Sequence, residues 1–136
     1  MATKVLDSWS LLAFFKGEPA GEEVENLLHK AAMEQYRLLL CVVNWGEVYY
    51  TIMRAGSREI AEQTAHEISG LSIEIVPVDG MNLELARQAA IYKATKKMSY
   101  ADCFAAALSK IRKAELVTGD PEFKQVEDEI KIKWLK

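Results

Sequence analysis

Four acidic residues, far apart in the sequence, have the types and spacing that could do chemistry: Asp7, Glu47, Asp102 and Asp120. Carboxylates that converge on one spot repel one another unless a cation joins them. Oxygen ligands without cysteine or histidine partners favour Mg²⁺ or Mn²⁺. Such an ion lowers the pKa of a bound water and stabilises charge on a phosphoryl group. These acids therefore indicate metal-assisted phosphodiester hydrolysis, with Asp7, Asp102 and Asp120 as metal ligands and Glu47 completing the ligand set or positioning water.

Helix capping is an alternative explanation for each acid taken singly. Asn44-Trp45-Gly46-Glu47 and Ser99-Tyr100-Ala101-Asp102 have the spacing of a capping box. Asp120 before Pro121 fits an N-cap followed by proline, and Asp7 is placed to cap the helix after it. Only the convergence of all four on one edge of a sheet favours a metal site over four separate caps.

Other catalytic chemistries have weaker support. The only histidines, His29 and His66, fall in the middle of predicted helices, which argues against a Ser-His-Asp triad or a two-histidine ribonuclease. The chain has no glycine-rich phosphate loop, Walker motif or GxGxxG. Cys41 and Cys103 lie in apolar runs without metal-ligand spacing, so we expect buried free thiols in a reducing cytoplasm.

Strands and helices alternate along the sequence. The apolar patterns predict strands at residues 3–6, 37–43, 72–76, 115–118 and 130–134, and helices at residues 8–15, 21–32, 44–54, 57–69, 79–94 and 99–111, with Asp79 and Ser99 as caps of the last two. This order predicts a three-layer α/β/α fold with a mainly parallel, five-stranded sheet. Ligands of such sheets bind outside the carboxyl ends of the strands, where the acids are expected.

Composition bounds the remaining possibilities. The chain has 136 residues, 50% of them hydrophobic and 27% charged, which predicts one domain over residues 1–136. The net charge of −3 means that any nucleic-acid contact needs basic residues gathered on one face. No apolar run approaches the ~20 residues of a membrane span, and no secretory signal is visible, so no membrane association is expected.

Four motifs and a closing strand carry a family resemblance. They are Val5-Leu6-Asp7-Ser8, Asn44-Trp45-Gly46-Glu47, Ser99-Tyr100-Ala101-Asp102-Cys103-Phe104-Ala105-Ala106-Ala107, Thr118-Gly119-Asp120-Pro121-Glu122-Phe123 and Ile130-Lys131-Ile132. In this order and at these separations, they resemble the PIN-domain nucleases, and more narrowly the VapC-like toxin ribonucleases of toxin–antitoxin pairs.

This resemblance implies a Mg²⁺- or Mn²⁺-dependent endoribonuclease that cleaves structured RNA of the tRNA or rRNA class. It also implies a homodimer and a cognate antitoxin protein. By position, Asp7, Glu47, Asp102 and Asp120 match the family's acidic quartet, and Thr118 matches a hydroxyl that orients it. Ser8, next to Asp7, is expected to support the acids as well. Trp9 departs from the pattern, because a small residue is commoner there, and its ring is placed to narrow the site or to stack on a base.

Basic residues precede Asp102 in the stretch Leu85–Ala101, which contains no acid. We expect Lys93, Lys96 and Lys97 to contact RNA, together with Arg54 after the Glu47 helix. Aromatic and apolar residues are also more numerous than two short helices can bury, which suggests a groove for a partner protein. They are Trp9, Leu12, Phe14, Phe15, Tyr49, Tyr50 and Met53.

A silent binding module and a receiver domain are two alternatives to the nuclease. A catalytically silent PIN-like module that binds RNA or a protein does not need clustered, mutually repulsive carboxylates, so the intact acidic set argues against it. A phospho-accepting receiver domain also places acids at the sheet edge. It needs a pair of acids after the first strand, whereas Asp7 stands between Leu6 and Ser8.

Overall fold

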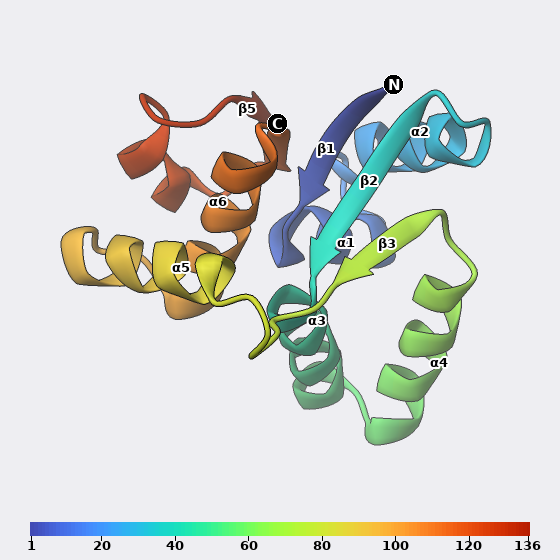
Figure 1. Cartoon of the computed structure of the whole chain (residues 1–136). Coiled ribbons are helices and arrows are strands. Elements are labelled where there is room, and N and C mark those ends of the chain that lie inside the picture. Colours follow the sequence, from blue (N-terminus) through green and yellow to red (C-terminus); the bar gives the residue numbers. More distant parts are fainter.

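The computed structural model describes residues 1–136 and contains five strands and seven helical segments (Figure 1). In chain order they are β1 (Ala2–Leu6), α1 (Ser8–Phe15), α2 (Gly21–Ala32), β2 (Tyr36–Cys41), α3 (Val42–Ala55), α4 (Arg58–Ser69), β3 (Ile73–Val76), α5 (Glu84–Thr95), α6 (Tyr100–Arg112), β4 (Glu115–Thr118), the 3₁₀ helix η1 (Pro121–Val126) and β5 (Ile132–Trp134). No helix is long and apolar enough to cross a membrane.

The five strands form one parallel sheet in the order β3-β2-β1-β4-β5, which confirms the predicted sheet. From the central strand β1 the chain builds outward to β2 and β3, and then returns to the other side of β1 with β4 and β5. The order therefore reverses between β1 and β4. Such a switch point is where open α/β sheets bind their ligands, outside the carboxyl ends of the strands.

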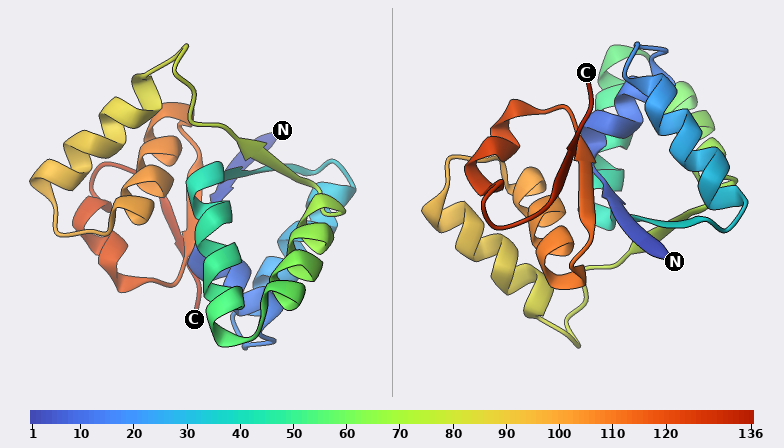
Figure 2. Two further views of the ribbon diagram at one scale, coloured as in Figure 1. Left: turned by 90° about the horizontal axis from the view of Figure 1, so that it is seen from below. Right: turned by 90° about the horizontal axis from the view of Figure 1, so that it is seen from above.

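Alternate side chains of the strands feed two separate cores. Val5, Leu39 and Leu116 pack with α5, α6 and η1, whereas Leu6, Leu40 and Val117 pack with residues of the first four helices. Figure 2 shows α5 and α6 on one side of the sheet and α1 to α4 on the other. Burial on both faces explains the near-continuous apolar sequence of the central strands and confirms the three-layer architecture.

The predicted boundary between the second strand and its helix was wrong. The strand was expected to include residues 42 and 43, but β2 ends at Cys41 and α3 begins at Val42. Asn44 is thus the third residue of α3 rather than its cap, and it is buried. The apolar run continues across the boundary, so nothing in its hydrophobicity marks the change from strand to helix.

The predicted helix cap at Asp79 was also wrong, because α5 begins at Glu84. Oδ1 of Asp79 accepts a hydrogen bond from the backbone N–H of Met81 (2.7 Å), and Asn82 does the same for Glu84 (3.0 Å). Short polar side chains that bind the backbone two residues on make turns as readily as caps. Residues 77–83 therefore form a loop between β3 and α5.

Candidate metal centre

Asp7 leaves the central strand at the switch point and is fully buried. One carboxylate oxygen caps α1, because Oδ1 accepts from the backbone N–H of Ser10 at 2.9 Å. The other oxygen, Oδ2, accepts from the hydroxyl of Thr118 at 2.6 Å. The capping explanation of Asp7 is thus correct, but it involves only one of the two oxygens. A cap and a metal ligand are compatible in this residue.

Asp120 is held at the same place by the end of β4. Its backbone N–H donates to Oγ1 of Thr118 at 3.0 Å, and its Oδ1 caps η1 by accepting from the N–H of Glu122 at 2.9 Å. Pro121 follows at the first position of that helix, as the sequence predicted. The single hydroxyl of Thr118 therefore links the carboxylate of Asp7 to the backbone of Asp120.

Asp102 occupies the third position of α6 and is 5% exposed. Ser99 caps this helix through its hydroxyl, which accepts from the N–H of Asp102 at 3.2 Å. The reciprocal half of the predicted capping box is absent, because the N–H of Ser99 donates to Oε1 of Glu122 instead. The carboxylate of Asp102 has no hydrogen-bond partner in the chain, so both of its oxygens are available to a ligand.

Glu47 lies in the second turn of α3 and is half-buried. The hydroxyl of Ser8 donates to Oε1 of Glu47 at 2.6 Å, which joins α3 to the start of α1. The predicted capping box of Asn44 and Glu47 is wrong, since Cys41 is the N-cap of α3. Asn44 has another role: its Nδ2 donates to the carbonyl of Ala101 at 3.0 Å and ties α3 to the residue before Asp102.

The acids crowd one another electrostatically. Burial, followed by the charges of Asp120, Asp7, Glu122 and Glu47, raises the pKa of Asp102 from 3.8 to about 8. Burial also raises the pKa of Asp7 to about 6, although the hydrogen bonds from Thr118 and Ser10 oppose the rise. The other three acids chosen from the sequence, Asp7, Glu47 and Asp120, are thus close enough to act on Asp102. Their charged forms are costly together unless a cation neutralises them.

Glu122 is a member of this cluster that sequence reasoning missed. Asp102, Asp120 and Glu122 each offer an oxygen within 4.8 Å of the other two. The motif around Asp120 contained Glu122, but spacing gave it no role. The sequence did contain a signal for it. Asp120-Pro121 marks the start of a helix, and Glu122 falls in the first turn of that helix, next to the capping residue Asp120. Closely spaced carboxylates without a nitrogen or sulfur donor fit a hard divalent cation such as Mg²⁺ or Mn²⁺.

The predicted RNA-contacting residues fall into two groups. Lys93 donates to the carbonyl of Met98 at 2.9 Å, and Lys96 pairs with Glu129 at 3.6 Å, so both are partly engaged within the chain. Lys97 is exposed, and its backbone N–H donates to Gln125 of η1, next to the acids.

Arg54 lies over the ring of Tyr50 in the last turn of α3. It is seven residues, or about 10 Å of helix, beyond Glu47.

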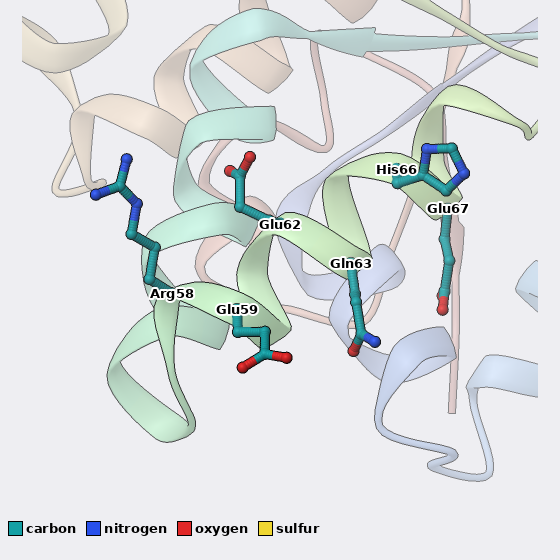
Figure 3. A pocket seen from close by; sticks show the side chains of 6 residues that line it. All are labelled: Arg58, Glu59, Glu62, Gln63, His66 and Glu67. Atoms are coloured by element: carbon teal, nitrogen blue, oxygen red, sulfur yellow. The ribbon is translucent and has the colours of Figure 1, made fainter.

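A separate surface hollow lies along α4 (Figure 3). Its lining carries three carboxylates and one guanidinium, and consists of Arg58, Glu59, Glu62, Gln63, His66 and Glu67. None of these residues belongs to the acidic cluster, and the excess of negative charge does not suit an RNA backbone. His66 is in this hollow, and His29 is exposed on α2 beside Glu25. No imidazole therefore accompanies the acids.

Comparisons with known proteins agree with this geometry. The family model described as PIN domain matches residues 4–129. No curated protein matches the chain. A chain in the DNA-bound VapBC2 structure from Rickettsia felis aligns with a TM-score of 0.73 at 14% identity, covering 98% of this chain and 99% of that one. DNA-bound VapBC from Salmonella typhimurium gives 0.71 at 18% identity, covering 98% of both. VapC20 from Mycobacterium tuberculosis, described as a sarcin–ricin loop cleaving toxin, gives 0.68 at 15%, covering 90% of this chain and 94% of that one.

Proposed function

Because the chain belongs to the PIN-domain family, we propose that it is a Mg²⁺- or Mn²⁺-dependent endoribonuclease and the toxin of a type II toxin–antitoxin pair. One observation carries this proposal: Asp102, Asp120 and Glu122 each offer an oxygen within 4.8 Å of the other two, and the charges of Asp7 and Glu47 also act on the buried Asp102. A protein that only binds RNA does not need such a cluster, which disfavours a catalytically silent module.

We assign the metal to Asp7, Asp102 and Asp120, with Glu122 within ligand reach. A bound divalent ion supplies charge stabilisation at a phosphoryl group and lowers the pKa of coordinated water. Thr118 holds Asp7 and the backbone of Asp120 in place through its hydroxyl. Glu47, oriented by Ser8, is the acid placed to hold a water by hydrogen bonding. Lys97 is the basic residue best placed to receive the RNA backbone, because it is exposed and bonded to η1.

The substrate and partners follow from the same comparison. Some fold relatives of this chain are described as members of toxin–antitoxin complexes or systems, and another is described as a toxin that cleaves the sarcin–ricin loop. The proposed substrate is accordingly structured RNA of the tRNA or rRNA class. The proposed protein partners are a cognate antitoxin and a second copy of this chain, with the cytoplasm as the compartment.

Cleavage assays with purified protein test the nuclease directly. RNA should be cut with Mg²⁺ or Mn²⁺ and left intact with a chelator, and the products should carry 5′-phosphate and 3′-hydroxyl ends. No imidazole lies beside the acids to deprotonate a ribose 2′-hydroxyl, so water is the expected nucleophile. Asp102→Asn should cut no RNA, whereas Asp128→Asn, which changes an exposed acid outside the cluster, is its matched control and should cleave normally. Products with 2′,3′-cyclic phosphate ends would exclude this mechanism.

A further inference from the structure

The indole of Trp9 lies directly against Gly119. A Cβ atom placed on Gly119 would stand 2.5 Å from Cζ3 of Trp9 and 2.6 Å from Cζ2, with Cη2 closer still. Carbon atoms in contact are normally about 3.5–4.0 Å apart. The six-membered ring of Trp9 therefore occupies the space that any other residue at position 119 would need.

The glycine is required here for space and not for backbone conformation. Gly17 is the only glycine with a positive φ, so the backbone at Gly119 is one that any residue can adopt. The restriction is local to some glycines: a Cβ on Gly21 would also be crowded, by the backbone of Ala13, whereas a Cβ on Gly46, one residue before Glu47, would have nothing within 4 Å. For alanine to fit at position 119, either the indole of Trp9 or the turn at Gly119 must shift.

Both partners of this contact adjoin the acidic centre. Trp9 lies in the first turn of α1, the helix that Asp7 caps. Gly119 connects Thr118 to Asp120, and those two residues share the hydrogen bond that positions Asp120. A shift of the turn at Gly119 away from the ring therefore moves Asp120 relative to Asp7.

We propose that Trp9 and Gly119 form a matched pair of side-chain sizes that sets the position of Asp120 relative to Asp7. Trp9 acts as a positioning residue through Gly119. This inference rests on the proposed function, because it assigns Asp7 and Asp120 to one metal ion. It goes further in predicting that a second change compensates a harmful one: a large residue at position 119 needs a small residue at position 9.

A double-mutant cycle tests the pair with Gly119→Ala, Trp9→Ala and the double variant, and with Gly46→Ala as the control. The midpoint of the Mn²⁺-dependent rise in melting temperature reports metal binding without any RNA. The kcat and KM of RNA cleavage are measured at a temperature where circular dichroism shows every variant folded. Because misplacing a catalytic group by ~1 Å costs up to about 100-fold, we expect Gly119→Ala to lose roughly 10- to 100-fold in kcat. It should also need several-fold more Mn²⁺, with little change in KM.

The double variant decides the question. We expect it to return to within a few-fold of Trp9→Ala in both kcat and Mn²⁺ midpoint, while Gly46→Ala behaves like the parent. A double variant as impaired as Gly119→Ala would overturn the pairing, as would a Gly119→Ala that matches Gly46→Ala. A parent that responds to Mn²⁺ but cuts no RNA would overturn the nuclease alone, since the midpoints still test the pair. A parent without any Mn²⁺ response would overturn both.

Discussion

The hydroxyl of Thr118 donates a 2.6 Å hydrogen bond to the carboxylate of Asp7, although 111 positions separate the two residues. Sheet register explains their meeting, because Leu6 of β1 pairs with Val117 of β4. Asp7 directly follows Leu6, and Thr118 directly follows Val117. The same hydroxyl accepts from the N–H of Asp120. One small side chain thus fixes two of the proposed metal ligands at the edge where β1 and β4 end.

Thr118→Val should impair metal binding while keeping the shape of the side chain. Asp7 loses a hydrogen bond that lowers its pKa, and the N–H of Asp120 loses its acceptor. Unpaired buried polar groups cost about 1–3 kcal/mol, so we expect a lower melting temperature and a higher Mg²⁺ midpoint. Thr118→Ser keeps the hydroxyl and should restore the midpoint. Equal midpoints for the valine and serine variants would mean that the hydroxyl does not position the acids.

Glu122→Gln tests the acid that spacing alone did not reveal. Glutamine keeps the oxygen that accepts from the N–H of Ser99 but removes one charge from the cluster. We expect a weaker response of the melting temperature to Mg²⁺ and slower cleavage, without loss of stability in chelator. Glu127→Gln, an exposed acid at the end of η1, is the control and should change neither. If both glutamine variants respond to Mg²⁺ like the parent, Glu122 is not part of the metal site.

The salt dependence of RNA binding tests the path of the substrate. Lys97→Ala should reduce the slope of log K against log salt by ~0.7 for a single-stranded contact and ~0.9 for a duplex. Lys96→Ala should change the slope less, because Lys96 pairs with Glu129. Lys30→Ala provides the control. Lys30 lies in the last turn of α2, close to Tyr36 at the amino end of β2, whereas the acids lie at the carboxyl ends of the strands. A slope altered by Lys30 and not by Lys97 would place the RNA elsewhere.

Local sequence was sufficient where a feature depends on a few neighbouring residues. Helix α1, strand β4 and the caps at Ser99 and Asp120 agree with the prediction. The two caps depend only on backbone groups two or three residues away. The meeting of Asp7 with the end of β4 could also be predicted, because parallel strands place their carboxyl ends at one edge. The joint role of Asp7, Glu47, Asp102 and Asp120 stays a prediction.

Features that depend on distant partners could not be predicted. The pairing of Lys96 with Glu129 joins α5 to the segment after η1, and nothing near Lys96 in the sequence indicates it. Trp9 and Gly119 meet only because α1 and β4 adjoin in the fold. The start of α3 at Val42 was missed for another reason, since its apolar sequence suits a buried strand as well as a helix.

The stability of the metal-free protein should depend on pH through Asp102. Its folded pKa of about 8 lies above the ordinary value of 3.8, so the folded state binds the proton more tightly than the unfolded state. The resulting stabilisation is fully present below pH 3.8 and is lost as pH rises through about 8. In chelator, the melting temperature of the parent should therefore fall as pH rises from 3.8 to about 8, relative to a variant that lacks this carboxyl.

Asp102→Asn is that variant, because asparagine resembles the neutral carboxyl. Groups that titrate in both proteins cancel in the difference between their melting temperatures. Near pH 4 in chelator the two should melt alike, and at pH 9 the variant should melt higher. About 1 kcal/mol moves the melting temperature of such a domain by roughly 2–8 °C, so the difference is measurable.

Mg²⁺ should raise the melting temperature of the parent, and more so at pH 9, because metal and proton compete for the carboxylates. The variant should respond far less and cut no RNA. A variant that melts lower than the parent in chelator at both pH values, with an unchanged Mg²⁺ response, would show that Asp102 stabilises the start of α6 and binds no metal.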